Sequence, residues 1–310
     1  YRSFNKQESN LNRIIYNFVN TSIYLTIAKL TSAMYQKGND IQIKVNGITV
    51  NYNDMGESKL PIIFIHGFPF DQSSWKLQLD YLQQHCRVIT YDIRGFGKST
   101  HTDEKPTITL LADDLVQFMD ALQIPKAIVC GLSMGGYILL NALNRYPERF
   151  AAIILSNTQC IADTAEAKEK RQKNIQLVGS GGLSEYTENM IQNLFYTESF
   201  TSKPEAVASI RKTMLSTKPT IITDTLHALA NREEMCYTLS NILIPTLIIS
   251  GKEDKSIPFQ QSSFMHQQIP RSILQLIDKA GHLPNLEQPD EFNRLVKDFA
   301  MSMHIMHVAG

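Results

Sequence analysis

The chain has 310 residues, of which 43% are hydrophobic and 19% are charged, and this length suits one large α/β domain with an insertion or two small domains. Its 30 basic residues balance 30 acidic ones, so the formal net charge is zero. This balance gives no electrostatic case for binding nucleic acid or an anionic membrane surface, and we expect neither partner.

Residues 1–40 are interpreted as an N-terminal extension of uncertain role. The uncharged stretch at residues 14–28 contains Asn17, Asn20 and Thr21, and it is too short and too polar for a helix that spans a bilayer. An additional amphipathic helix is the preferred interpretation, and a targeting or membrane-surface segment is the alternative. We therefore expect no membrane span and a cytoplasmic location.

From residue 41 onward, the pattern predicts a mostly parallel, eight-stranded sheet. Alternation around an Asn-Gly pair at residues 46–47 is typical of a β-hairpin. Apolar runs that indicate buried strands follow at residues 62–65, 88–91, 127–130, 151–155, 246–250 and 273–277. Apolar residues at helical spacing predict helices at residues 107–122, 135–146 and 290–301. Such alternation is typical of an α/β sheet with helices on both faces.

About ninety residues after the sixth strand lack a clear strand pattern and read as about four helices, with Pro204 and Pro219 as breakers. An all-helical insertion in an α/β sheet is most simply a lid. The expected organisation is an α/β core at residues 41–158 and 242–303, with a helical lid at residues 159–241.

The strongest chemical signal is the sequence Gly-Leu-Ser-Met-Gly-Gly at residues 131–136, between a predicted strand and a predicted helix. This is the setting of a nucleophile elbow, a turn so tight that the residues two before and two after the serine must be nearly free of side chain. Ser133 is therefore the predicted nucleophile. Its place at the start of a helix favours developing negative charge.

An oxyanion hole is expected from two backbone amides, those of Phe68 and Met134. Phe68 lies in the His-Gly-Phe-Pro sequence that directly follows the strand at residues 62–65. His66 in the same sequence could be a catalytic base. We prefer the interpretation that it braces the loop by hydrogen bonds, because the base is expected after the last strand.

The general base is predicted to be His282, in the sequence Ala-Gly-His-Leu-Pro after the last strand. The acid of a triad should follow the preceding strand, where Glu253 and Asp254 both qualify by position. Asp254 has the usual Gly-x-x-Asp spacing and is the preferred acid.

Other motifs predict no cofactor and no metal. Gly-Lys-Ser at residues 97–99 lacks the earlier glycine of a phosphate-binding loop, since Asp92 occupies that position. The four cysteines are scattered and have no Cys-x-x-Cys spacing. We expect reduced, mostly buried thiols rather than a disulfide or a zinc site.

Taken together, these motifs resemble the α/β-hydrolase superfamily over residues 41–299. Within it the sequence is similar to the 3-oxoadipate enol-lactonase-like group, with neighbouring esterases and cofactor-free haloperoxidase-like enzymes. The matching stretches are residues 66–71 with Trp75, 92–99, 131–137, 145–149, 156–158 and 281–289. The resemblance implies hydrolysis of a small-molecule ester or lactone through a serine. Some relatives carry the acid after the sixth strand, where residues 156–158 read Ser-Asn-Thr.

Alternative functions on this scaffold are a general carboxylesterase, a carbon–carbon bond hydrolase and, more remotely, a non-catalytic small-molecule receptor. An enol-lactone of the 3-oxoadipate type carries a remote carboxylate, which a closed pocket holds only with a cation. The lid cations are Arg171, Lys173, Arg211, Lys212 and Arg232. Arg171 and Arg211 are the preferred partners, because guanidinium binds carboxylate in a bidentate way. Each could instead lie on a solvated helix face. The sequence predicts no oligomeric state.

Overall fold

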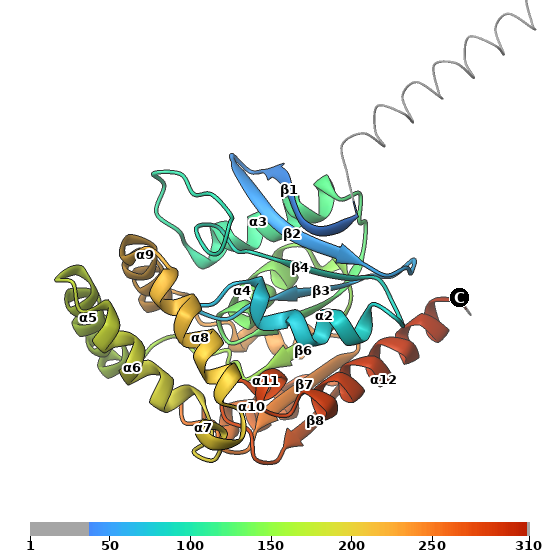
Figure 1. Cartoon of the computed structure of the whole chain (residues 1–310). Helices are drawn as coiled ribbons and strands as arrows, with labels where there is room; N and C mark the ends of the chain where they lie inside the picture. Colours follow the sequence, from blue (N-terminus) through green and yellow to red (C-terminus); the bar gives the residue numbers. More distant parts are fainter. Residues whose placement is uncertain (1–36, 309–310) are drawn as a thin grey trace, which may run out of the picture. The chain divides into compact units, whose positions relative to one another are not determined.

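One sheet organises residues 37–308, the part of the chain that this computed structural model describes (Figure 1). The interpretation of residues 1–36 lies outside the described residues. The strands are β1 (Gly38–Val45), β2 (Ile48–Met55), β3 (Ile62–Ile65), β4 (Val88–Tyr91), β5 (Ala127–Leu132), β6 (Phe150–Ser156), β7 (Thr246–Gly251) and β8 (Ser272–Ile277).

The order of the eight described strands in the sheet is β1-β2-β4-β3-β5-β6-β7-β8. β1 and β2 pair antiparallel through the predicted hairpin, in which Asn46 and Gly47 both have positive φ, of 46° and 77°. β2 also pairs antiparallel with β4, whereas the remaining strands run parallel. The predicted mostly parallel, eight-stranded sheet is confirmed.

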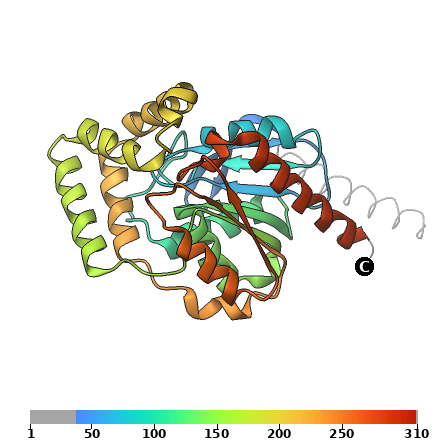
Figure 2. The same ribbon diagram turned by 90° about the horizontal axis from the view of Figure 1, so that it is seen from below.

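Helices cover both faces of the sheet (Figures 1 and 2). On one face α2 (Lys76–Leu82) packs with α11 (Pro284–Glu287) and α12 (Pro289–Val308), and on the other α3 (Ile108–Ala121) packs with α4 (Met134–Arg145). α10 (Phe259–Gln268) packs against β7 and β8. Fully buried Trp75 joins the first face, because its ring contacts Phe64 of β3 and Phe292 of α12. Burying this aromatic surface stabilises the packing of α12 against the sheet.

The predicted helical insertion follows β6. It consists of α5 (Ala165–Gly179), α6 (Leu183–Leu194), α7 (Ser199–Ser202), α8 (Pro204–Ser216), α9 (Pro219–Ala230) and the short η3 (Cys236–Asn241). Pro204 and Pro219 each occupy the first turn of a helix, where a missing amide hydrogen costs nothing. Gly181, with φ of 94°, makes the turn between α5 and α6. We refer to residues 165–241 as the insertion, and its helices gather at one side of the sheet (Figure 2).

A disulfide joins Cys160, in the segment just before the insertion, to Cys236 near the end of the insertion, and it corrects the expectation of four reduced thiols. The two cysteines are 76 positions apart and meet because the chain leaves β6 and returns toward β7 at the same place; Met235 N donates to Cys160 O at 2.8 Å. Cys86 and Cys130 are free and buried, as expected. A disulfide typically stabilises a fold by about 2–4 kcal/mol, and the effect grows with the length of the loop that it closes in the unfolded chain.

The disulfide also bears on the compartment. Disulfides persist in oxidising compartments and are rare in the cytosol. The cytoplasmic location therefore stays a prediction, with this bond as an observation against it. Within residues 37–308, no helix combines the length and the apolar character that crossing a bilayer requires.

Candidate active site

Ser133 occupies a sharp turn between β5 and α4. Its φ of 52° and ψ of −115° lie outside the regions that L-residues favour. The turn has no room for side chains beside it: a Cβ on Gly131 would lie 2.4 Å from Gly135 O, and a Cβ on Gly135 would lie 2.4 Å from Ile65 O. Glycine at both positions therefore allows the close approach of strand, turn and helix. This arrangement presents the serine at the carboxyl edge of the sheet.

The two residues predicted to supply an oxyanion hole lie at the same place. Phe68 and Met134 line one cavity together with Ser133. Met134 is the first residue of α4, so no earlier turn of the helix accepts its amide hydrogen. The structure therefore brings together both residues predicted to supply an oxyanion hole, beside a helix N-terminus whose dipole favours negative charge.

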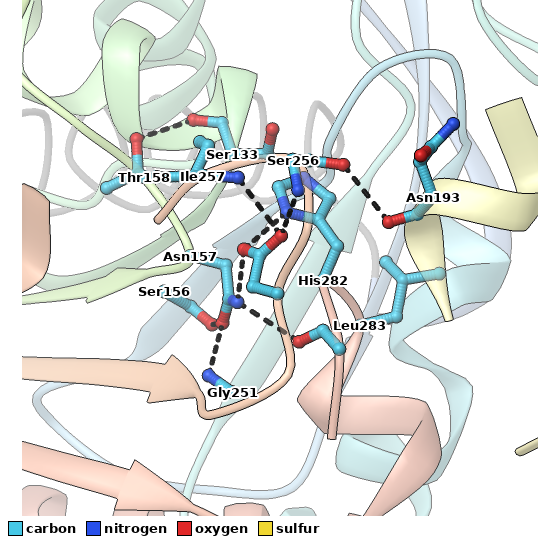
Figure 3. A network of polar contacts seen from close by, with 12 residues as sticks. Ser133, Ser156, Asn157, Thr158, Asn193, Gly251, Ser256, Ile257, His282 and Leu283 are labelled. Carbon is cyan, nitrogen blue, oxygen red and sulfur yellow. Dashed lines mark hydrogen bonds and ion pairs between the residues drawn. The ribbon is translucent and has the colours of Figure 1, made fainter. Parts of the chain in front are cut away.

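His282 lies in the loop after β8 and contacts Asp254, which lies in the loop after β7 (Figure 3). His282 Nδ1 is 2.8 Å from Asp254 Oδ2, and both side chains are at least 96% buried. Asp254 Oδ1 accepts the backbone amides of Ser256 and Ile257 at 2.7 and 3.0 Å. These bonds leave Oδ2 directed to the imidazole, so that the remaining ring nitrogen, Nε2, is available to another group.

The electrostatics keep Asp254 ionised at neutral pH. Burial alone would raise the pKa of this carboxyl, but the charge and hydrogen bond of His282 oppose it. Further hydrogen bonds from Asn157 and the Ile257 amide also favour the carboxylate, and the pKa lies below its ordinary value. An ionised Asp254 can stabilise an imidazolium on His282.

Asn157 is a member of this site that the sequence reasoning missed. Its Nδ2 donates to Asp254 Oδ2 at 2.7 Å and to Gly281 O at 3.2 Å, and its Oδ1 accepts Gly251 N at 3.4 Å (Figure 3). Asn157 has a positive φ of 43°, which asparagine tolerates well. It joins the loops that follow β6, β7 and β8. The available signal was the position of Asn157 directly after the sixth strand, where some relatives carry the acid. We considered only a carboxylate there and not an amide.

His66 braces the loop that carries Phe68, as predicted. It is fully buried, its Nε2 accepts the amide of Ile93 at 3.0 Å, and its Nδ1 lies 2.9 Å from Gly67 O. Burial lowers the pKa of His66 to about 4, so it stays neutral at neutral pH. With both ring nitrogens engaged, His66 is not available as a base.

A cavity of about 400 Å³ connects these groups with the insertion. Ser133 and His282 line it from the core, and helices α5, α6 and α9 supply the opposite wall. Leu226, Leu229 and Met190 give that wall an apolar part. Among residues 37–308, no cluster of histidine, cysteine, aspartate or glutamate side chains could hold a metal ion. The cavity can bind a small organic molecule over the serine.

The two arginines predicted to bind substrate lie in different places. Arg171 lines the cavity, but its guanidinium contacts Asp163, which also accepts from Arg232. Arg211 lies outside the cavity, and its guanidinium contacts Glu188 at 2.7 Å on the surface of α8. The structure therefore brings only Arg171 to the site, where it shares the single carboxylate of Asp163 with Arg232.

The other predicted cations do not reach the cavity with a free charge. Arg232 is buried among α9 and the residues after β6, where it contacts Asp163 and donates to Ile161 O at 2.9 Å. Lys173 is exposed and pairs with Glu169 at 2.7 Å. Lys212 lines a separate surface hollow beside Arg211.

Lys170 and Lys255 are cavity residues that the sequence reasoning missed. Both line the cavity and are largely exposed, and within the described part of the chain neither makes an ion pair. Lys255 Nζ lies 3.5 Å from the hydroxyl of Thr197. Lys255 directly follows Asp254, and that adjacency was the available signal. These two lysines are the cationic groups lining the cavity that make no ion pair with a described carboxylate.

Comparisons with known proteins agree with the fold. Residues 61–289 match the family model described as the alpha/beta hydrolase fold. The chain is 31% identical over 251 residues to 3-oxoadipate enol-lactonase 2 of Acinetobacter baylyi, an alignment that covers 81% of this chain and 92% of that protein. Among solved structures, a thermophilic esterase from Thermogutta terrifontis has a TM-score of 0.81 and 32% identity, covering 85% of this chain and 98% of that one. The enol-lactonase from Burkholderia xenovorans has a TM-score of 0.79 and 27% identity, with coverage of 84% and 100%.

Proposed function

This chain belongs to the α/β-hydrolase family and is a hydrolase of the ester or lactone type, and we propose that it acts through an acyl-enzyme formed on Ser133. In this proposal His282 is the general base and Asp254 the acid of the triad. The observation that carries it is the fully hydrogen-bonded Asp254, in contact with His282 at the rim of the cavity that holds Ser133.

The proposed reaction has two steps. His282 Nε2 accepts the proton of the Ser133 hydroxyl as its oxygen attacks the carbonyl carbon, and the amides of Phe68 and Met134 stabilise the oxyanion. His282 then donates that proton to the leaving alkoxide, and the acyl group stays on Ser133. A water that loses a proton to His282 releases the acid and restores the serine. Asp254 stabilises the imidazolium in both steps.

The proposed substrate is a lactone that carries a remote carboxylate, of the 3-oxoadipate enol-lactone type. Support comes from Lys170 and Lys255, which line the cavity and make no ion pair within residues 37–308, so that an anion there would meet two cations. Arg171 serves as part of the wall, and it shares the carboxylate of Asp163 with Arg232. A general carboxylesterase is the second candidate, supported by the apolar surface of Leu226, Leu229 and Met190 in the same cavity.

A charge-removal experiment distinguishes the two substrates. The double variant Lys170→Gln and Lys255→Gln is expected to lower kcat/KM for a carboxylate-bearing lactone by about 5- to 10-fold, since two partly exposed ion pairs contribute up to about 1 kcal/mol each. It should leave kcat/KM for the methyl ester of that lactone within about twofold of the wild type.

The matched control is the double variant Lys173→Gln and Lys252→Gln. These lysines lie near the first pair in sequence, pair with Glu169 and Asp278, and do not line the cavity. The control should change neither rate. If the wild type prefers the methyl ester, and the cavity lysines affect neither compound, the anionic-lactone proposal fails and the carboxylesterase proposal stands.

A further inference from the structure

The loop that carries His282 is attached to the insertion at residues 194–199, which we call the docking segment. The amide of His282 itself donates to Leu194 O at 2.7 Å. Gly281, the preceding residue, fits so closely that a Cβ would lie 2.7 Å from Tyr196 N and 2.8 Å from Leu194 O. The position of the backbone around the proposed base therefore depends on contacts with the insertion as well as on the α/β core.

Glu287 binds the docking segment and the His282 loop at once. It is completely buried. Its Oε2 accepts Tyr196 N at 2.7 Å and the hydroxyl of Ser199 at 2.6 Å. Its Oε1 accepts Gly281 N at 2.8 Å and Leu283 N at 3.4 Å. Each carboxylate oxygen thus serves one of the two segments.

A buried carboxylate is costly unless hydrogen bonds replace its hydration. Burial raises the pKa of Glu287, and the bonds from Ser199, Tyr196, Gly281 and Leu283 oppose this rise. Among residues 37–308, no lysine, arginine or histidine makes an ion pair with it. All four donors are present only when the docking segment lies against the His282 loop. The carboxylate therefore couples the two positions energetically.

We propose that Glu287 is a positioning residue, which sets the place of His282 by tying its loop to the docking segment of the insertion. This inference rests on the proposed role of His282 as the base. Removing one of the two sets of bonds lets the loop shift, and a misplacement of about 1 Å can cost on the order of 100-fold in rate. The reacting groups themselves remain unchanged.

Two substitutions test this positioning role, one at Glu287 and one at its partner in the docking segment. Glu287→Gln keeps the shape of the side chain but places an NH₂ group against two of the four donors. Ser199→Ala leaves Glu287 intact and removes only the hydroxyl on the insertion side. We expect kcat for a p-nitrophenyl ester to fall by about 10- to 100-fold in the first and by a smaller factor in the second, with KM within about twofold.

Matched controls lie close by in the sequence. Glu291→Gln, four residues on in α12, changes an exposed carboxylate. Ser202→Ala, three residues on in α7, removes a hydroxyl that bonds only Glu198 O. Both controls should keep the wild-type kcat.

The nitrogen NMR signals of the His282 ring give a second measurement that needs no substrate. Glu287→Gln and Ser199→Ala should shift these signals away from their wild-type positions, and the two controls should not. If the two variants shift the ring signals but the wild-type protein hydrolyses no ester or lactone, the positioning role of Glu287 stands and the proposed function fails. Unchanged kcat and unchanged ring signals in Ser199→Ala and in a folded Glu287→Gln overturn the inference. If Glu287→Gln does not fold, Ser199→Ala decides alone.

Discussion

Ser133→Ala is expected to abolish ester and lactone hydrolysis, with a loss of about 10⁴- to 10⁶-fold in kcat. The substitution removes the attacking oxygen and leaves alanine in the strained turn, with φ of 52°. The fold should remain, because the hydroxyl makes no described hydrogen bond and the close contacts of the turn belong to Gly131 and Gly135. The measurement is kcat for a p-nitrophenyl ester, with thermal unfolding of the same sample.

Ser256→Ala is the matched control for this variant. Ser256 also lines the cavity, and its hydroxyl donates only to Asn193 O, at 3.3 Å. Its backbone amide, which donates to Asp254, is unaffected by the change. We expect Ser256→Ala to retain activity within tenfold. Activity of Ser133→Ala within tenfold of the wild type would remove Ser133 from the mechanism.

Asp254→Asn is expected to lower kcat by about 10⁴-fold, the usual effect of losing the carboxylate that holds the imidazole tautomer. The neutral amide cannot stabilise an imidazolium on His282. It would also face the amide group of Asn157, which donates to Oδ2 in the native site. Kinetic measurement at saturating substrate separates this effect from weakened binding.

Glu253→Gln provides the comparison for Asp254. Glu253 is exposed and directly precedes Asp254, so both variants remove one negative charge from the same loop. Glu253→Gln should change kcat by less than about twofold. If the larger loss instead followed Glu253→Gln, the acid of the triad would have to be reassigned.

The buried strands were predictable because burial leaves a strong signal in local sequence. The expected strands at residues 62–65 and 88–91 coincide with β3 and β4, whose residues are buried on both faces. The last strand was expected at residues 273–277, and β8 begins at Ser272. β8 lies at the edge of the sheet, where Ile273 is 53% exposed. The apolar pattern therefore indicated the start of this strand less clearly.

Contacts between distant segments were not predictable in the same way. The Cys160–Cys236 disulfide, the bond from Asn157 to Asp254 and the bond from Tyr196 N to Glu287 join residues 76, 97 and 91 positions apart. No local spacing encodes such a pair. Each depends on how the insertion leaves and rejoins the sheet, which is a property of the packed fold.

The sequence also could not predict which cations of the insertion face the cavity. Arg171 and Lys173 lie two positions apart on α5, which places them on different sides of the helix. Arg171 lines the cavity, and Lys173 pairs with Glu169 in solvent. Helical spacing separates these faces, but only packing against α6 and α9 determines which face meets the cavity.

Trapping the covalent intermediate tests the central claim most directly. The wild-type protein is mixed with p-nitrophenyl acetate, quenched in acid within the first turnover, digested and analysed by mass spectrometry. The account predicts one acetyl group on the peptide that contains Ser133 and none on that peptide in Ser133→Ala. An acetyl group only on another residue, or p-nitrophenol release at the wild-type rate with Ser133 unmodified, would contradict it.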